Sequence, residues 1–530
     1  MRNKVLTLPA SARWGSALTT AFVAAAATYS WWHGVSPWLG FTIALVAGTA
    51  TDMIWAAREI VPLPHIALLI ASLQYGLAPW ASNFYPSLYA EYQINDLPEY
   101  FDYAGPVLAA MTLGFLLSGM GLRLKHSDSE RQYLNPGLLR ELDFLLWGGV
   151  VFSLFFSHAQ GSLAFVMVLL GCLRYIGAIG WMIVAAPGWK WRVGVLLLFE
   201  IYNASSSGMF HDLILWSLSL LAIYVFLRHV KRLVFVSALV GLVAAIFFLQ
   251  DAKWTLRDAI WNESNEIVLF GKPMTFSPWT RPFVSAFCLV DSCTKFFSGG
   301  YSEESIANSV TRFNQGWIID RVMHHMPSEE PFARGETIWG ALRAAALPRF
   351  LAPDKLVVNG RVNMERFAGH DMVGDTTMNI GFGGEMYANF GLWGGVIGCG
   401  CYALVLGLFF RWAAVLAQKS PFWWAIAVFC GHWAFKAETD IGGVLNYVVK
   451  SVILVFFVTL LMPALRNELL GKSTEAGRST DDPRGSRRQI RGRKSGFRSP
   501  HPDMEPVPAT VPMEQHRISP IPNQIKNADA

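Results

Sequence analysis

"TTMNIGFGGEMYANFGLWGGVIG", residues 376–398, begins as a glycine-rich polar stretch and ends as an apolar segment typical of a membrane helix. It carries a carboxylate, a phenol and an amide (Glu385, Tyr387 and Asn389) where the chain passes from water into hydrocarbon. A carboxylate at the edge of the lipid is costly unless it is paired or functional. The stretch therefore predicts a membrane-spanning fold with a polar site at its edge.

Composition supports the membrane-spanning fold. Of the 530 residues, 53% are apolar, 14% are aromatic and only 15% are charged. A soluble protein of this length needs more charge to cover its surface, so we expect a polytopic membrane protein. Apolar runs of about 17–25 residues are long enough to cross a hydrocarbon core of roughly 30 Å. We count about twelve such runs, near residues 15–33, 36–57, 62–82, 102–122, 142–158, 162–186, 192–207, 209–227, 232–250, 388–410, 421–437 and 444–464.

The distribution of basic residues predicts the orientation, because cytoplasmic loops are enriched in Lys and Arg. With the N-terminus inside, "GWKWR" (188–192) and "RHVKR" (228–232) lie in the cytoplasm, as does the C-terminal tail. We predict an all-α polytopic membrane protein with about 12 transmembrane helices, one large, partly helical extracytoplasmic loop and both termini cytoplasmic. Its expected parts are a transmembrane bundle at 1–250 (about nine spans), the loop at 251–387, a second bundle at 388–465 (about three spans) and a disordered basic tail at 466–530.

Two helices are predicted within the large loop. The stretch "SEESIANSVTRFNQGWIIDRVMHHM" (302–326) has Ser302 as a candidate N-cap and apolar residues at helical spacing, which predicts one amphipathic helix. The stretch "GETIWGALRAAAL" (335–347) predicts a second helix that ends at Pro348.

The loop also holds Cys288 and Cys293. An oxidising compartment would permit a disulfide between them, and both the paired and the free state stay open. No Cys or His spacing typical of zinc is present, so we expect no metal and no cofactor. The basic residues of the loop are scattered and slightly outnumbered by acidic ones, which argues against nucleic acid as a partner.

The helix entering the membrane after the loop has an unusual length. Residues 376–410 would form a helix of about 50 Å, too long for one straight crossing. Its first turns must therefore protrude or fold back. The spacing of Gly391 with Gly395, and of Gly394 with Gly398, is typical of close helix packing.

Ionisable residues gather at the predicted outer ends of several spans. They include Glu385 and the residues Glu200, His211, Asp212, Lys253, Arg257, Lys436, Glu438 and Asp440. Acids, bases and cations at this boundary suit a substrate with a lipid tail and an anionic head group. Arg174, in the middle of a span, has no assigned role.

The order of segments in the second half resembles bacterial O-antigen polymerase-like proteins, which polymerise oligosaccharide repeat units. The resemblance covers residues 250–400 and the layout of many spans with one large outer loop. It lies in Lys253 and Arg257 after a span, Arg312 in a loop helix, "LPRFLAPDK" (347–355) and "GGEMYANFGLWGG" (383–395).

The resemblance implies a membrane glycosyltransferase that joins repeat units linked to undecaprenyl diphosphate at the outer face of the inner membrane. Membrane lipid, a chain-length regulator and other export proteins are the implied partners. Arginine and lysine would stabilise the departing diphosphate, the candidates being Arg257, Arg312, Arg349 and Lys355, with Lys253 in support.

The same chemistry needs a base that takes a proton from the attacking hydroxyl. Glu385 is the first candidate for this base, and His370, Asp375 and His211 are the alternatives. Tyr387 and Asn389 would orient sugar hydroxyls or hold the start of the helix. Three other functions stay open: an O-antigen ligase, a transporter or flippase of lipid-linked glycan, and a non-catalytic scaffold of an export complex.

Overall fold

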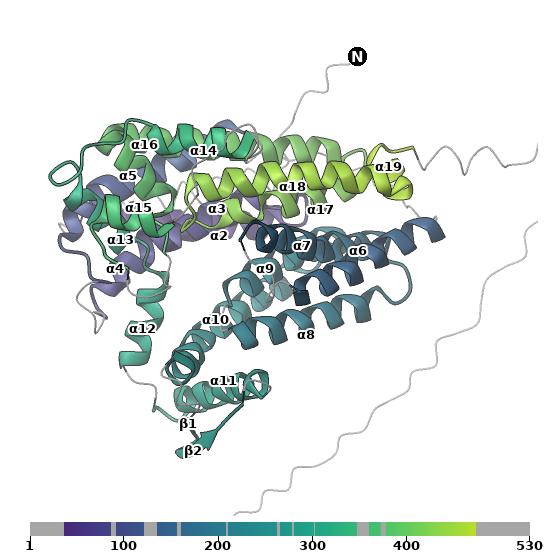
Figure 1. Cartoon of the computed structure of the whole chain (residues 1–530), viewed down its shortest axis with the longest axis horizontal. Helices are drawn as coiled ribbons and strands as arrows, with labels where there is room; N and C mark the ends of the chain where they lie inside the picture. The colour runs from purple at the N-terminus through teal and green to yellow at the C-terminus, as the bar shows by residue number, and fades with distance from the viewer. Residues whose placement is uncertain are drawn as a thin grey trace, which may run out of the picture. The chain divides into compact units, whose positions relative to one another are not determined.

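A computed structural model describes residues 36–85, 92–120, 135–155, 161–207, 210–261, 266–277, 280–300, 303–346, 360–372 and 378–472. These ranges belong to one compact unit, which ends at Ser473. The described part is almost entirely helical, as the sequence predicts (Figure 1).

The first half of the described chain is a series of helices of unequal length. In chain order these are α2 (Pro37–Ala56), α3 (Leu63–Ser72), the π-helical turn η1 (Leu73–Leu77), α4 (Ala78–Ser82), α5 (Leu97–Leu117), α6 (Pro136–Phe155), α7 (Gly161–Val184), α8 (Trp189–Ser207), α9 (His211–Arg228) and α10 (Arg232–Trp261).

The second half begins with a small hairpin and returns to helices. Its elements are β1 (Glu266–Leu269), β2 (Lys272–Thr275), α11 (Arg281–Phe297), α12 (Glu303–Phe313), α13 (Gly316–His325), α14 (Glu336–Ala346), α15 (Gly360–Ala368), α16 (Gly381–Ala417), α17 (Phe422–Gly431), the 3₁₀ turn η4 (His432–Phe435), α18 (Ile441–Leu461) and α19 (Pro463–Leu469).

The hairpin is the only sheet in the described residues. β1 and β2 pair antiparallel, with Leu269 opposite Lys272. The two residues between them, Phe270 and Gly271, both have positive φ, as the tightest hairpin turns require. The inner face of β1 packs with α11 in a small apolar cluster.

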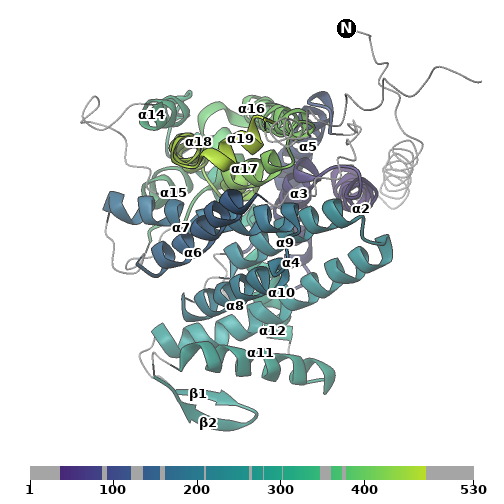
Figure 2. The ribbon, with the colours of Figure 1, turned by 90° about the vertical axis from the view of Figure 1, so that its right-hand side faces the viewer.

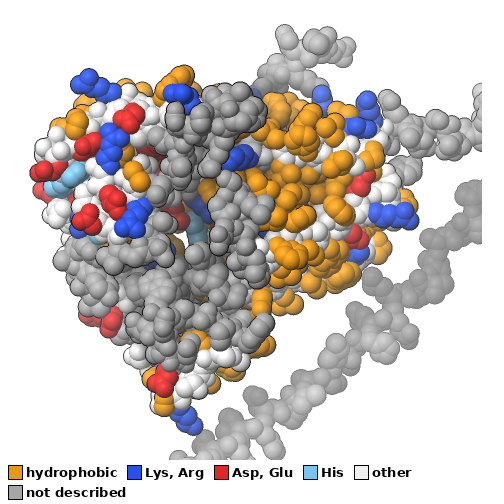
Figure 3. Space-filling view, in the orientation of Figure 1, with side chains coloured by type: hydrophobic (Ala, Val, Ile, Leu, Met, Phe, Trp, Pro, Cys, Tyr) orange, Lys and Arg blue, Asp and Glu red, His pale blue; other side chains and the backbone are white. Residues whose placement is uncertain are grey.

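Six described helices are long and apolar enough to cross a membrane: Pro37–Ala56, Leu97–Leu117, Ala164–Val184, His211–Arg228, Gly381–Ala417 and Ile441–Leu461. Two shorter apolar segments, Arg232–Ala245 and Phe422–Phe435, accompany them. Hydrophobic side chains cover much of the right-hand part of Figure 3, whereas charged side chains gather on the left. The molecule thus has the helices of a multi-pass membrane protein.

The six helices found among the described residues are fewer than the twelve runs predicted from hydropathy. The run at 62–82 is divided into α3, η1 and α4, and the run at 192–207 lies in α8, a helix that also contains Lys190, Arg192 and Glu200. The run at 15–33 lies outside the described residues.

The prediction of one helix at 302–326 is wrong, because the structure has two, α12 and α13. The break is at Asn314, whose side-chain oxygen accepts hydrogen bonds from the backbone N–H groups of Gly316 and Trp317 at 2.9 and 3.3 Å. This side chain therefore caps α13 and competes with continuation of α12. The second predicted helix, at 335–347, is confirmed as α14.

Of the two alternatives predicted for the start of the helix after the loop, protruding or folding back, the structure has the second. α16 turns sharply at Gly391, which has φ 68° and ψ −164°, a backbone conformation that favours glycine. We call Gly381–Phe390 the first arm and Leu392–Ala417 the second arm. The ring of Phe382 stacks on that of Tyr402 with centroids 4.6 Å apart, so the two arms run antiparallel.

Glycines on the second arm permit this close return. A Cβ atom at Gly394 would lie 2.4 Å from the Cβ of Phe390, and one at Gly398 would lie 2.5 Å from the sulfur of Met386. The predicted glycine packing is thus real, but part of it is between the two arms of one hairpin. The second arm also packs closely along α5.

Candidate functional site

Two buried carboxyl groups link the first arm of α16 to the start of α18. Glu385 is 2% exposed, and its Oε2 accepts a hydrogen bond of 2.7 Å from the backbone N–H of Ile441, the first residue of α18. Asp440 is 1% exposed, and its Oδ1 accepts one of 3.1 Å from the N–H of Gly381, the first residue of α16. Glu385 of α16 therefore caps the N-terminus of α18, and Asp440, just before α18, caps the N-terminus of α16.

The two carboxyl groups influence each other because both are buried. Burial raises the pKa of Asp440 to about 8, and the negative charge of Glu385 contributes to this rise. Asn363 also donates a hydrogen bond of 2.9 Å to Asp440 Oδ2. At neutral pH, Asp440 therefore holds a proton beside Glu385. The first candidate for the base is occupied in helix capping and is shielded from solvent.

The two other polar residues of the opening stretch also make internal contacts. The side-chain amide of Asn389 donates to Thr337 Oγ1 at 2.8 Å and accepts from the N–H of Gly335 at 2.9 Å, which fixes the start of α14. The ring of Tyr387 packs edge-on against Tyr103 of α5, with centroids 4.9 Å apart. Of the two roles considered for this pair, the geometry favours holding the helix start.

A second group of ionisable residues lies at the start of α9 and in and just after η4, and three of its side chains, those of His211, Asp212 and Glu438, are accessible. We call His211, Asp212, His432, Lys436 and Glu438 the outer polar cluster. His211 Nδ1 lies 2.8 Å from Glu438 Oε1, and the side chains are 34% and 36% exposed. Lys436 donates a hydrogen bond to Asp212, whose side chain is 61% exposed. The cluster thus places an imidazole, two carboxylates and an ammonium group at the solvent boundary.

His432 was not among the residues proposed from sequence. It is 1% exposed and its ring stacks on Trp216, with centroids 4.0 Å apart. Neither ring nitrogen has a hydrogen-bond partner in the described part of the chain, and the nearest carboxylate oxygen, Asp212 Oδ1, is 3.6 Å from Nε2. The only sequence signal is a histidine within the apolar run 421–437.

Arg312 is the predicted cation that the structure places near this cluster. It is exposed in the last turn of α12. Desolvation raises the pKa of the Glu438 carboxyl, but the charges of His211, Lys436 and Arg312 together lower it to about 2. The positive charge is therefore felt at the cluster, and Glu438 stays ionised.

The structure places the remaining predicted cations only in part. Lys253 and Arg257 lie in the last turns of α10, whose side chains are not described there, and α12 packs against this helix. Arg349, Lys355 and Asp375 lie outside the described residues.

Arg174 has a partner that sequence reasoning did not identify. Its guanidinium group forms a two-point ion pair with Glu200 of α8, in which Nη2 donates to Oε2 at 3.1 Å. Arg174 is 6% exposed and Glu200 is 4% exposed, and the guanidinium also lies over the ring of Tyr175. The pair joins α7 to α8 inside the helical bundle.

Two other predictions fall away from the cluster. His370 follows α15 and packs against Trp317 of α13, with ring centroids 5.8 Å apart. Cys288 and Cys293 are free thiols five positions apart on α11, so the disulfide considered from sequence is not formed. Within the described ranges, no group of three or more His, Cys, Asp or Glu side chains is placed to hold a metal ion.

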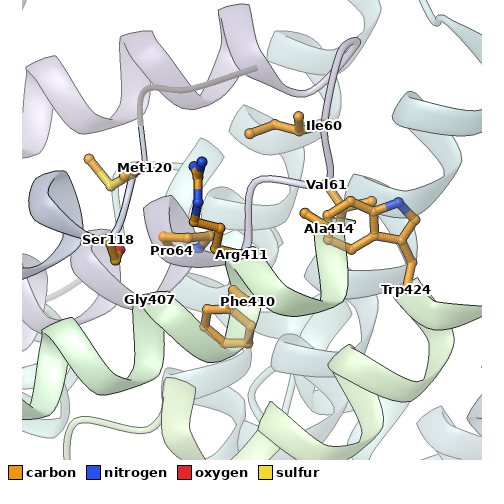
Figure 4. Close-up of a pocket in the computed structure, with 11 residues that line it drawn as sticks. Ile60, Val61, Pro64, Ser118, Met120, Gly407, Phe410, Arg411, Ala414 and Trp424 are labelled. Carbon is orange, nitrogen blue, oxygen red and sulfur yellow. The ribbon is translucent and has the colours of Figure 1, made fainter. Parts of the chain in front are cut away.

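A small, mainly apolar pocket lies near the other end of the second arm (Figure 4). It is lined by Phe410 and Arg411 of α16, by residues near the start of α3 and by Ser118 and Met120 after α5. None of the residues that line this pocket belongs to the outer polar cluster.

No protein-family model, curated protein or solved structure matches this chain. The interpretation of the site therefore rests on its own residues and their geometry.

Proposed function

We propose that the chain is a membrane glycosyltransferase of the repeat-unit polymerase type. It would join oligosaccharides carried on undecaprenyl diphosphate at the outer face of the bacterial inner membrane. The observation that supports this best is the outer polar cluster with Arg312 nearby, because it combines accessible acid–base groups with cations at the ends of apolar helices. A lipid-linked diphosphate presents its charged group at this boundary.

The cations would act on the leaving group. When the bond between the anomeric carbon and the phosphate oxygen breaks, negative charge develops on the diphosphate. Arg312 is exposed and Lys436 lies within the cluster, so both suit this role, with Lys253, Arg257, Arg349 and Lys355 as the further cations predicted from sequence. Guanidinium groups bind phosphate oxygens through paired hydrogen bonds, and no metal ion is needed for this step.

His211 is the best-placed general base. Its imidazole is about one-third exposed and its Nδ1 lies 2.8 Å from Glu438 Oε1, a contact that orients the ring. The attacking sugar hydroxyl would give its proton to His211 as its oxygen bonds to the anomeric carbon. Glu385 becomes less suitable for this role, since it is buried and caps α18.

The proposal includes the finer topology predicted from sequence: about twelve spans, both termini in the cytoplasm and residues 251–387 outside. Cytoplasmic Lys and Arg and the acidic loop at 83–101 support this orientation. The partners would be membrane lipid, a chain-length regulator and other export proteins.

The test compares lipid-linked glycans in cells that lack the gene and in cells that carry His211→Ala or Lys436→Ala. We expect single repeat units to accumulate on the outer face, without longer chains, in all three. Lys295→Ala removes a partly exposed lysine on α11, paired with Asp291 and not part of the cluster, and serves as the matched control. If both variants make chains of normal length at normal protein levels, the cluster is not the catalytic site.

The same experiment separates two other candidates. An O-antigen ligase would use the same groups on a different acceptor, and its loss would leave full-length chains on the lipid carrier. A transporter or flippase is favoured by one observation, the buried Arg174–Glu200 pair, because ion pairs deep in a bundle are typical of transport pathways. Loss of a transporter would trap repeat units on the inner face.

A further inference from the structure

The position of α14 is not what its place in a predicted outer loop suggests. Asn389 fixes the start of α14 through Thr337 and the N–H of Gly335. One turn away on the same arm, Glu385 caps the first residue of α18. Both helices therefore start beside the first arm of α16, within about one turn of each other.

From these starts, α14 and α18 run side by side. The two lie next to each other in Figure 1, are both seen nearly end-on in Figure 2, and pack together along their length. At 1.5 Å per residue, the 11 residues of α14 extend about 16 Å along the 21 residues, or roughly 30 Å, of α18. α14 therefore covers about the first half of a helix that is apolar enough to span the membrane.

The exposure of the two helices is complementary. Among the described residues of α18, the large apolar side chains that are exposed lie only in its second half: Val452, Ile453, Phe456, Phe457, Leu460 and Leu461. α14 turns small residues inward, with Ala341 and Ala344 buried. On its outer side, Trp339 is 64% exposed and Leu342 is 44% exposed. These two residues continue the exposed apolar face of α18 toward its N-terminal end.

The composition of α14 is compatible with hydrocarbon. After its first residue, Glu336, its only charged residue is Arg343. Side chains on a helix point toward its N-terminus, so the guanidinium of Arg343 reaches back toward the level of Glu336 and the head groups. The backbone of a helix satisfies its own hydrogen bonds, as hydrocarbon requires.

We propose that α14 is a re-entrant helix in the outer leaflet, whose Trp339–Leu342 face contacts lipid acyl chains. The loop predicted at 251–387 then enters the membrane between its ends. Contact with lipid is inferred from packing and exposure, and the outer leaflet from the predicted orientation, so the inference stands or falls independently of the proposed enzymatic activity.

The first test measures labelling of single added cysteines by a charged, membrane-impermeant maleimide in intact membranes. We expect Trp339→Cys and Leu342→Cys to react about tenfold or more slowly than Glu329→Cys, because water and charged reagents are excluded from hydrocarbon. Glu329 is exposed in the turn after α13, and Phe457→Cys on α18 is the lipid-facing control. The unmodified chain, with its six cysteines, gives the background, and labelling in detergent at denaturing temperature confirms equal reactivity.

A second measurement tests whether protein, and not lipid, covers the Trp339–Leu342 face of α14, and it needs no substitution. The purified protein is placed in bilayers that contain a phospholipid with a photoreactive diazirine at the end of one acyl chain. Adducts on the peptide that contains Trp339, as well as on α18, would support the proposal. Labelling of Trp339→Cys as fast as Glu329→Cys would overturn it, as would adducts on α18 with none on α14.

Discussion

The proton that Asp440 holds beside Glu385 makes a specific prediction about stability and pH. The pKa of Asp440 is about 8 in the folded protein, against an ordinary value near 3.8. Because folding raises the pKa of Asp440, protonation of this carboxyl favours the folded state. Its contribution to the free energy of unfolding is complete below the ordinary pKa and is lost as the pH rises through 8. With these two values, linkage gives a loss of about 2 kcal/mol between pH 6 and pH 8.

Asp440→Asn removes this titration and keeps the capping geometry. The amide oxygen still accepts from the N–H of Gly381, and the side chain of Asn363 can rotate to offer its oxygen to the new amide. We therefore expect the free energy of unfolding to fall by about 2 kcal/mol less in the variant than in the natural chain between pH 6 and pH 8. For a large domain this corresponds to a difference of roughly 2–4 °C in the pH-dependent fall of the melting temperature.

The assay measures thermal unfolding of the purified protein in detergent at pH 6, 7 and 8. The fraction that remains folded after heating is measured by size-exclusion chromatography. Asp371→Asn, an exposed carboxylate after α15, is the control and should follow the natural chain. If Asp440→Asn loses stability between pH 6 and pH 8 as steeply as the natural chain, Asp440 is not the protonated member of the pair and the reasoning fails.

Two further substitutions test the buried polar groups. Glu385→Gln retains an oxygen for the N–H of Ile441 and should leave the melting temperature and the glycan chain length nearly unchanged. Glu385→Ala leaves this buried donor unpaired and should lower the free energy of unfolding by about 1–3 kcal/mol. Loss of polymer in the Gln variant at normal stability would restore Glu385 as the base. Arg174→Met leaves Glu200 charged and buried and should lower the free energy of unfolding by about 3–5 kcal/mol. The double variant, which also carries Glu200→Met, should recover most of this loss. Additive losses in thermal unfolding would show that the two side chains are not coupled.

Sequence reasoning identified the fold class because composition and long apolar runs report directly on membrane-spanning helices. It was less successful in counting them, since hydropathy averages over local breaks such as the π-helical turn at Leu73–Leu77. It predicted that the first turns of α16 would either protrude or fold back, because a helix of that length exceeds the membrane, but it did not decide between the two. The break at Asn314 was missed because its capping bonds depend on one side-chain conformation.

The site was harder to predict than the fold because its pairs join distant parts of the chain. His211 and Glu438 are separated by 227 positions, yet their side chains are 2.8 Å apart. The partner of Arg174 and the position of His432 behind Trp216 likewise depend on helix packing. A single sequence shows which residues are ionisable and at which depth they lie, but not which of them meet.

The opening stretch shows how a folding requirement can resemble a catalytic motif. Its glycines permit the turn at Gly391 and the return of the second arm along the first. Its polar side chains cap or hold the starts of neighbouring helices. Buried helix ends need such partners whether or not a reaction takes place there. Glu385 and Asn389 are therefore accounted for by structure alone. Evidence for chemistry should instead be sought at His211 and Arg312, which lie outside that stretch and are accessible, and at Lys436 within the same cluster.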